Sequence, residues 1–344
     1  MESKKRNLNL DLTKCIAVFT VLSVHFFYNN GFYSIPVSTP RMYLMTGMRT
    51  LFMVCVPLFL LVTGALMNKK ALSARYYRGI LHTLFIYLLS CIACMGFNYF
   101  YKGIPYTPSQ AILSIFDFSA AQYSWYVEMY LGLFLMIPFL NLIYQNLTTK
   151  RQKQILVLIF LALTSLPTMV NYYKEIVPNW WQGIYPISYY FLGAYLSEYP
   201  VSMKKRFLAL LLFIWIIFCT MFNIHFSYGE KFVWGIYNGW GGFQNVLSSA
   251  LLFALIQKLN LSGLPSLIKN IIVRISVLSF GTYLVSYIFD QIFYQKLNRT
   301  VLFMEDRLLY YPLIVPAVFI CSLLISQCFQ FLYQIIFRKQ QKMK

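Results

Sequence analysis

Charged residues are scarce in this sequence of 344 residues. Only 11% are Asp, Glu, Lys or Arg, whereas 59% are hydrophobic and 19% are aromatic. An average soluble domain has about 25% charged residues, so this composition excludes an ordinary soluble protein. The sequence also lacks low-complexity tracts, strong internal repeats and any polar segment long enough for a sizeable soluble domain. We therefore predict a multi-pass protein of the cell membrane.

The hydrophobic runs are about 18 to 25 residues long, and each can cross a hydrocarbon core of about 30 Å as a helix. They predict an all-α fold of about ten transmembrane helices, with residues 1–344 forming a single membrane-embedded domain and no appended soluble domain. No small-residue cleavage site follows the first run, which indicates an uncleaved first helix. The predicted spans are 11–30, 44–67, 79–101, 125–145, 154–171, 182–197, 207–226, 237–257, 270–296 and 308–337.

The formal charge of +19 follows the predicted topology and does not point to a nucleic-acid partner. If the N-terminus is placed in the cytoplasm, most Lys and Arg residues fall in inner loops, as the positive-inside rule expects. Both termini are then predicted to be cytoplasmic. The inner basic groups are Lys4–Arg6 with Lys14, Lys69–Arg78, Lys150–Lys153, Lys204–Arg206, Lys258–Arg274 and Arg338–Lys344.

Seven cysteines are present, mostly within the predicted spans. Cys91 and Cys94 have CxxC spacing, but a metal site needs further ligands close by and this helix offers none. We therefore predict no metal site and interpret these side chains as packing between helices.

The first hydrophobic run contains three ionisable residues, Asp11, Lys14 and His25. On a helix, Lys14 and His25 fall within about 20° of each other and Asp11 about 40° away, so one face carries all three. The axial separation of Lys14 and His25 is about 16 Å, which places His25 in the outer half of the membrane. Ionisable groups in spans are costly and are functional candidates. The alternatives are that Lys14 reaches the cytoplasmic interface and that His25 bridges helices structurally.

Three further charged residues share the predicted outer depth of His25. Arg49 begins the second helix, Glu128 lies one turn into the fourth, and Asp290 closes the face of the ninth that carries Tyr283 and Tyr287. A carboxylate near His25 would fix its tautomer and raise its basicity, as a general base requires. The alternative is a structural salt bridge between Arg49 and Glu128 or Asp290.

Two more features suggest ligands on either side of the membrane. Arg75 and Arg78, spaced i and i+3 in an inner loop, would lie on one helical face and could bind phosphates. Most tryptophans fall at outer helix ends, where Trp125 and Trp181 are candidates for stacking against a sugar. Anchoring at the membrane interface is the alternative for each tryptophan.

Several motifs match a known family. The first helix has a basic residue, ten intervening residues and a histidine (Lys14 and His25), and the second helix contains "VPLFLLVTGALM" from Val56 to Met67, followed by Arg-x-x-Arg at Arg75 and Arg78. "WYVEMYLGLFLMIPFL", "YFLGAYLSEY" and "SFGTYLVS" are weaker matches later in the chain. In these features the sequence resembles the acyltransferase 3 family of integral membrane enzymes. Two departures are Lys14, which is commonly arginine in the family, and Ser286, where many members have a second histidine.

The resemblance implies a membrane O-acetyltransferase. It would move acetyl from cytoplasmic acetyl-CoA, a cosubstrate and not a permanently bound cofactor, to a hydroxyl of a cell-surface polysaccharide or its lipid-linked precursor. Acetyl-CoA, the glycan acceptor and membrane lipids would be its partners, and nucleic acid would not. The alternative from another class is a transporter of a glycan or lipid intermediate, which would also have charges at mid-membrane depth.

In this hypothesis the candidate residues have distinct roles. Lys14, Arg75 and Arg78 bind the phosphates of the cosubstrate, and Trp125 and Trp181 contact the acceptor. His25 acts as a general base or a transient nucleophile, Glu128 or Asp290 orients it, and Arg49 stabilises the developing oxyanion.

Overall fold

The computed structural model describes residues 6–341, so Lys4, Lys5, Lys342 and Lys344 of the charge pattern lie outside the described residues. The chain is helical, and two isolated β-bridges join 36 to 231 and 37 to 228 in its described part. It divides into two compact units. Unit 1 contains the described residues up to Ala71 together with Ile137–Ser276, and unit 2 contains Leu72–Met136 and the described residues from Val277 onward.

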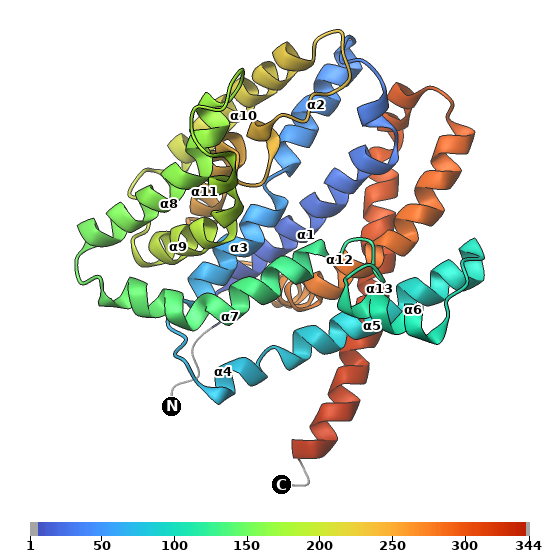
Figure 1. Ribbon diagram of the computed structural model, residues 1–344, viewed down its shortest axis with the longest axis horizontal. Coiled ribbons are helices and arrows are strands. Elements are labelled where there is room, and N and C mark those ends of the chain that lie inside the picture. Colours follow the sequence, from blue (N-terminus) through green and yellow to red (C-terminus); the bar gives the residue numbers. More distant parts are fainter. Residues whose placement is uncertain (1–5, 342–344) are drawn as a thin grey trace. The chain divides into compact units, whose positions relative to one another are not determined.

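Unit 1 is built from helices α1 to α3 and α8 to α11 (Figure 1). Within it α1 packs against α2, α3 and α11, while α10 packs against α2 and α11. Its elements are α1 (Leu8–Asn29), η1 (Phe32–Ser34), α2 (Pro40–Phe52), α3 (Cys55–Met67), α8 (Lys150–Val170), η2 (Asn179–Ile184), α9 (Tyr185–Glu198), α10 (Lys205–Ser227), η3 (Ile236–Asn238) and α11 (Phe243–Gln257).

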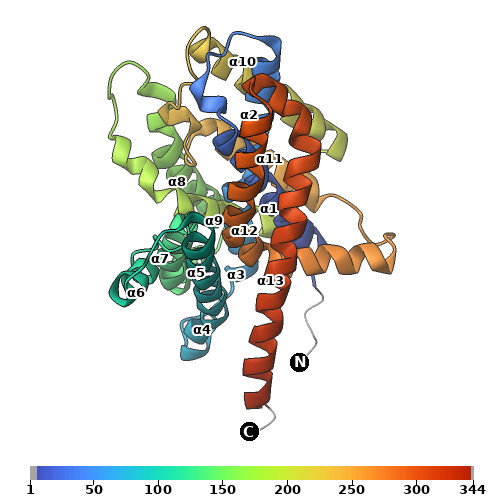
Figure 2. The same cartoon turned by 90° about the vertical axis from the view of Figure 1, so that its right-hand side faces the viewer.

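Unit 2 contains helices α4 to α6 and α13 (Figure 2). In it α5 packs against α6 and α13. Two long helices, α7 (Trp125–Asn146) and α12 (Ser266–Thr300), contribute residues to both units. The other elements of unit 2 are α4 (Ala74–Arg78), α5 (Leu81–Lys102), α6 (Pro108–Phe116), η4 (Met304–Tyr310) and α13 (Tyr311–Gln341).

Nine segments of the described chain are helical, long and apolar enough to cross a membrane, which confirms a multi-pass membrane protein. The prediction of ten spans was wrong at 182–197. This stretch forms the short 3₁₀ segment η2 followed by α9, which has 14 residues. A helix of that length rises only about 21 Å, less than the hydrocarbon core of about 30 Å.

The second predicted span is one apolar run in the sequence but two helices in the structure. α2 ends at Phe52 and α3 begins at Cys55. Pro57 has no N–H to donate to the carbonyl of Met53, and its ring would clash with that carbonyl in a continuous helix. The helix therefore breaks at Met53 and Val54. Arg49 lies in the last turn of α2, just before this break.

Two glycines let α3 and α9 pack backbone against backbone, and Figure 1 shows the two helices side by side. A Cβ atom at Gly64 would overlap the carbonyl oxygen of Tyr190, and a Cβ at Gly193 would overlap that of Leu61. Small residues serve this purpose in membrane proteins because no hydrophobic force drives helices together in lipid. The contact therefore explains Gly64 and Gly193 in two of the quoted motifs.

The C-terminal half of α7 closes the end of α3. The side-chain amide of Asn141 donates to the carbonyl oxygens of Met67 (2.8 Å) and Lys70 (2.7 Å), and Gln145 donates to that of Asn68 (2.8 Å). Asn141 in turn accepts a hydrogen bond of 2.5 Å from Tyr190 on α9. These bonds satisfy carbonyls that a helix end would otherwise leave without partners.

Gly193→Ala should lower the stability of the protein. The added methyl group must push α3 away from α9, and overpacking of this kind costs about 1–3 kcal/mol. The control is Gly96→Ala on α5, where a Cβ would meet no atom within 4 Å and alanine favours a helix. Thermal unfolding of both purified variants in detergent measures the difference. Equal unfolding temperatures for the two variants would contradict the glycine contact.

Candidate functional site

A cavity of about 880 Å³ lies in unit 1 beside the first turns of α1. Its charged lining residues are mostly basic, with a single carboxylate among them. The lining residues are Arg6, Asn7, Leu10, Asp11, Lys14, Ala65, Leu66, Lys69, Lys70, Leu196, Ser197, Pro200, Val201, Phe253, Ala254, Gln257 and Lys258.

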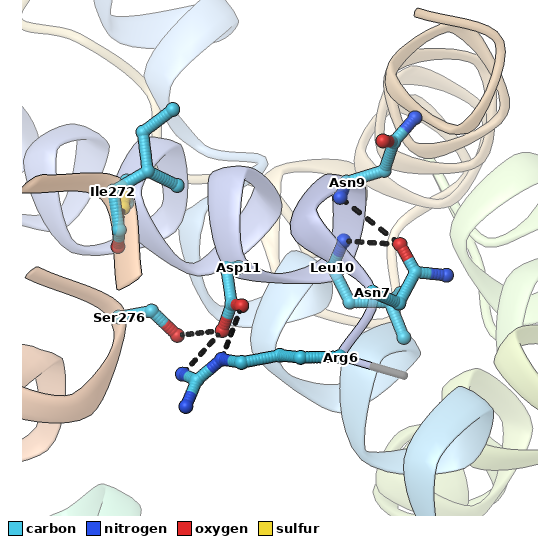
Figure 3. A network of polar contacts seen from close by, with 8 residues as sticks. Arg6, Asn7, Asn9, Leu10, Asp11, Ile272 and Ser276 are labelled. Carbon is cyan, nitrogen blue, oxygen red and sulfur yellow. Dashed lines mark hydrogen bonds and ion pairs between the residues drawn. The ribbon is translucent and has the colours of Figure 1, made fainter. Parts of the chain in front are cut away.

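Figure 3 shows how the carboxylate of Asp11 is held. It accepts hydrogen bonds from Nε and Nη2 of Arg6 (2.6 and 2.8 Å) and from the hydroxyl of Ser276 on α12 (2.6 Å). Asp11 is buried, whereas the side chain of Arg6 is half-exposed. The carboxylate raises the pKa of the Arg6 guanidinium, chiefly through their hydrogen bonds. Asp11 is therefore fully engaged in holding Arg6 and the first turns of α12.

The start of α1 is fixed by asparagines. The side chain of Asn7 caps the helix by accepting from the backbone N–H groups of Asn9 (3.0 Å) and Leu10 (3.3 Å) (Figure 3). The amide of Asn9 donates to the carbonyl oxygens of Ile256 (2.8 Å) and Leu259 (3.0 Å) at the end of α11. α1 therefore begins at a defined place against α11, with Lys14 on the cavity wall.

Four lysines give the cavity its charge, because Arg6 is paired with Asp11. Lys14 and Lys258 are half-buried, and Lys69 and Lys70 are exposed. None of the four forms an ion pair in the described part of the chain. An excess of ammonium groups in a concave site attracts anions. The cavity is therefore suited to a ligand with phosphate or carboxylate groups.

Arg75 and Arg78, the predicted partners of Lys14, belong to unit 2. They lie in the last turn of the short helix α4, which begins at the capping hydroxyl of Ser73. Both side chains are exposed. Lys69 and Lys70 of the same basic loop belong to unit 1 and line the cavity.

His25 lies on the same continuous helix as Lys14, as the sequence predicted. The rise of an α-helix separates the two residues by about 16 Å along its axis. The side chain of His25 is half-buried, and its backbone carbonyl accepts a hydrogen bond from Asn29 (2.8 Å). Phe26 and Phe27, which follow it, are fully buried and place this end of α1 in an aromatic core.

The two predicted carboxylates belong to unit 2 and have different surroundings. Glu128 is exposed on α7. Asp290 is fully buried on α12 and accepts a hydrogen bond of 2.8 Å from the hydroxyl of Tyr123. The ring of Tyr123 stacks against Tyr283 and meets Tyr287 edge-on, so Asp290 lies in an aromatic setting.

Arg49 is buried in unit 1 without a carboxylate. Its Nη1 donates to the side-chain oxygen of Asn238 (2.6 Å), and its Nε donates to the hydroxyl of Tyr33 (3.2 Å). It forms no ion pair among the described residues of unit 1. Its pairing with Glu128 or Asp290, which belong to unit 2, stays a prediction.

The two predicted acceptor-binding tryptophans are partly accessible. Trp125 is the first residue of α7 in unit 2 and is 38% exposed. Trp181 lies in η2 of unit 1, is half-buried, and meets Trp180 edge-on with ring centroids 6.5 Å apart.

Sequence reasoning missed the residues that hold the charged groups. Ser276 lies 265 positions from Asp11, and Asn238 lies 189 positions from Arg49. Both are polar residues far from their partners in the sequence, and no spacing links them to those partners. Tyr123 was missed as the donor to Asp290 for the same reason.

Comparison with known proteins gives one match. A family model described as an acyltransferase domain matches residues 7–327. No curated protein and no solved structure matches the chain.

Asp11→Asn should destabilise the protein, because the amide cannot accept all the hydrogen bonds that Arg6 and Ser276 donate to the carboxylate. Loss of a charged acceptor for a buried hydroxyl costs about 1–3 kcal/mol. The control is Asp117→Asn, since Asp117 is exposed and its described hydrogen bonds come from the nearby Ser119 alone. Thermal unfolding in detergent is the measurement. An unchanged midpoint for Asp11→Asn would show that this network adds nothing to stability.

Proposed function

The protein belongs to the acyltransferase 3 family of multi-pass membrane proteins, and from this premise we propose that it is an O-acetyltransferase. It takes acetyl from cytoplasmic acetyl-CoA and transfers it to a hydroxyl of a cell-surface polysaccharide or of its lipid-linked precursor. The basic cavity is the observation that carries the proposal. In the predicted topology, this cavity opens on the cytoplasmic side of the membrane.

The cavity matches the chemistry of the donor. Coenzyme A has phosphate groups at its nucleotide end, and lysine ammonium groups bind phosphate as point charges. The volume of about 880 Å³ lies within the usual range of small-molecule sites. Lys14, Lys69, Lys70 and Lys258 hold the phosphates in this proposal, and Arg75 and Arg78 remain predicted phosphate ligands.

His25 performs the transfer in this proposal. As a general base it takes the proton of the acceptor hydroxyl, whose oxygen attacks the thioester carbonyl; the C–S bond breaks and the thiolate of CoA leaves and is protonated. As a nucleophile it would carry the acetyl group between the two substrates. Both routes need His25 at a distance from Lys14 that an extended pantetheine arm can span. The role of Glu128 or Asp290 in orienting His25 stays a prediction.

The acceptor approaches from the opposite side of the membrane in this proposal. Trp125 and Trp181 supply flat apolar surfaces with a polar N–H, which suit the faces of sugar rings. Membrane lipids surround the spans.

His25→Ala should abolish acetylation of the surface glycan while leaving the protein in the membrane. Acetate released from purified glycan, normalised to the amount of protein in the membrane, is the measurement. His225→Ala is the control, because His225 is exposed on α10 and has no proposed role. If the His25→Ala variant released as much acetate from its glycan as the wild type, a catalytic role for His25 would be contradicted.

Lys69→Gln combined with Lys70→Gln should raise the KM for acetyl-CoA by about tenfold, because two phosphate contacts are lost and tenfold corresponds to about 1.4 kcal/mol. The rate of CoA release by purified protein, measured against acetyl-CoA concentration with candidate acceptors, reports this value. Lys204→Gln with Lys205→Gln is the matched control, an adjacent exposed pair outside the cavity. A transporter would release no CoA with any acceptor, and equal KM values for the two pairs would exclude this cavity as the donor site.

A further inference from the structure

Arg49 is a buried cation in neutral surroundings. Its side chain is among the largest fully buried ones, with 1% of the residue exposed. The guanidinium carbon lies 4.7 Å from the ring centroid of Phe232 and 4.3 Å from that of Trp234. Cation–π contacts of this kind stabilise a desolvated guanidinium, but burial of an ion without an opposite charge carries a large desolvation penalty.

The polar groups beside Arg49 are amides and hydroxyls. Asn238, which accepts from Arg49, donates to the side-chain oxygen of Asn223 (3.3 Å). Asn223 donates to Thr50 (2.9 Å) and to Gln244 (3.0 Å). All of these side chains are buried, and they bind one another without any carboxylate. The network fixes the position of the guanidinium but leaves its charge uncompensated.

Among the described residues of α2 and of the segment 228–242, three buried polar atoms have no hydrogen-bond partner. They are Nη2 of Arg49, the hydroxyl of Tyr237 and Oγ1 of Thr46. Thr46 precedes Arg49 by one turn on the same face of α2, and Tyr237 adjoins the residue that accepts from Arg49. Arg49 and Tyr237 interact electrostatically. Buried polar groups in folded proteins are normally paired, so these two side chains have donors to offer a bound group.

Two of the side chains that cover the guanidinium of Arg49 are themselves partly exposed. Trp234, whose ring lies over it, is 53% exposed, and Tyr33, which accepts from its Nε, is half-buried. Both side chains belong to segments without regular α-helix, at 30–39 and 228–242. One layer of side chains therefore separates Arg49 from the surface of unit 1.

We propose that Arg49 and Tyr237 form a binding site for an oxyanion, a phosphate or a carboxylate, of the acceptor. This inference rests on the proposed function and narrows it to acidic acceptors. Nη2 offers two N–H donors and Tyr237 one O–H donor, which is the donor set that a charged oxygen needs. The aromatic rings of Phe232 and Trp234 line the guanidinium and exclude water, which strengthens the attraction between the opposite charges.

This role differs from the one predicted for Arg49, stabilisation of the oxyanion that develops during transfer. A group that acts only on the transition state changes kcat and does not bind a stable anion. A site for the acceptor's own charge binds that charge without any donor present. Binding measured in the absence of acetyl-CoA therefore distinguishes the two roles.

The test is thermal unfolding of the full-length purified protein in detergent, titrated with four probes at constant ionic strength set by chloride. Inorganic phosphate and glucose 1-phosphate represent a phosphate, glucuronate represents a carboxylate, and glucose is the neutral control. We expect at least one oxyanion probe to raise the unfolding temperature progressively with its concentration, as a ligand of the folded state does, and glucose to have no effect. The probe that acts identifies the source of the charge.

The variants assign the effect to Arg49. Because the basic cavity also attracts anions, the Arg49 and Tyr237 variants are made in a protein that already carries Lys69→Gln and Lys70→Gln. In that background Arg49→Gln should abolish the shift, and Tyr237→Phe, which removes one hydroxyl, should reduce it. The shift should persist in Lys231→Gln, which removes an exposed charge from the same loop, and in Lys69→Gln with Lys70→Gln, which removes charge from the basic cavity.

Three results would overturn the proposal: no shift with any oxyanion probe, a shift that survives in Arg49→Gln, or a shift lost only in the cavity variant. If Arg49→Gln does not fold, the comparison of Tyr237→Phe with its parent, the Lys69→Gln and Lys70→Gln protein, decides, and equal shifts would reject the site. Because no acetyl-CoA is used, failure here is distinct from failure of the proposed function, which is judged by CoA release.

Discussion

Every polar group that this chain carries into the membrane needs a partner inside the protein, because lipid offers none. That constraint organises unit 1. Asn141 satisfies the carbonyls at the end of α3 and receives the hydroxyl of Tyr190, at the place where α3 and α9 touch through glycines. Asp11 is satisfied by Arg6 and Ser276. Helix ends and charges are thus fixed by specific side chains and not by apolar packing alone.

The functional proposals rest on two sets of cationic side chains. In the described part of unit 1, four lysines that form no ion pair line the cavity at the start of α1, and Arg49 is buried on α2 without an ion pair. Both are positively charged, and both suit substrates with negative groups. In our proposal the first receives the phosphates of the donor and the second an anionic group of the acceptor. His25 lies further along the helix that carries Lys14, and in the same proposal it performs the transfer.

The sequence predicted the class of the fold and the shared helix of Lys14 and His25, because long apolar runs and the helical repeat depend only on local spacing. Lys14 and His25 do share one unbroken helix. The break between α2 and α3 was missed although Pro57 marks it, and α9 was taken for a full span. The partners of Asp11, Arg49 and Asp290 come from distant parts of the chain, and one sequence contains no signal that joins Arg49 to Asn238 across 189 positions.

The central claim is that the basic cavity of unit 1 holds the acyl donor. An electron cryo-microscopy reconstruction of the protein with saturating acetyl-CoA tests it most directly. The account predicts density for the phosphates of CoA beside Lys14, Lys69 and Lys70. Density for the nucleotide at another place, with the cavity beside α1 free of it, would contradict the account.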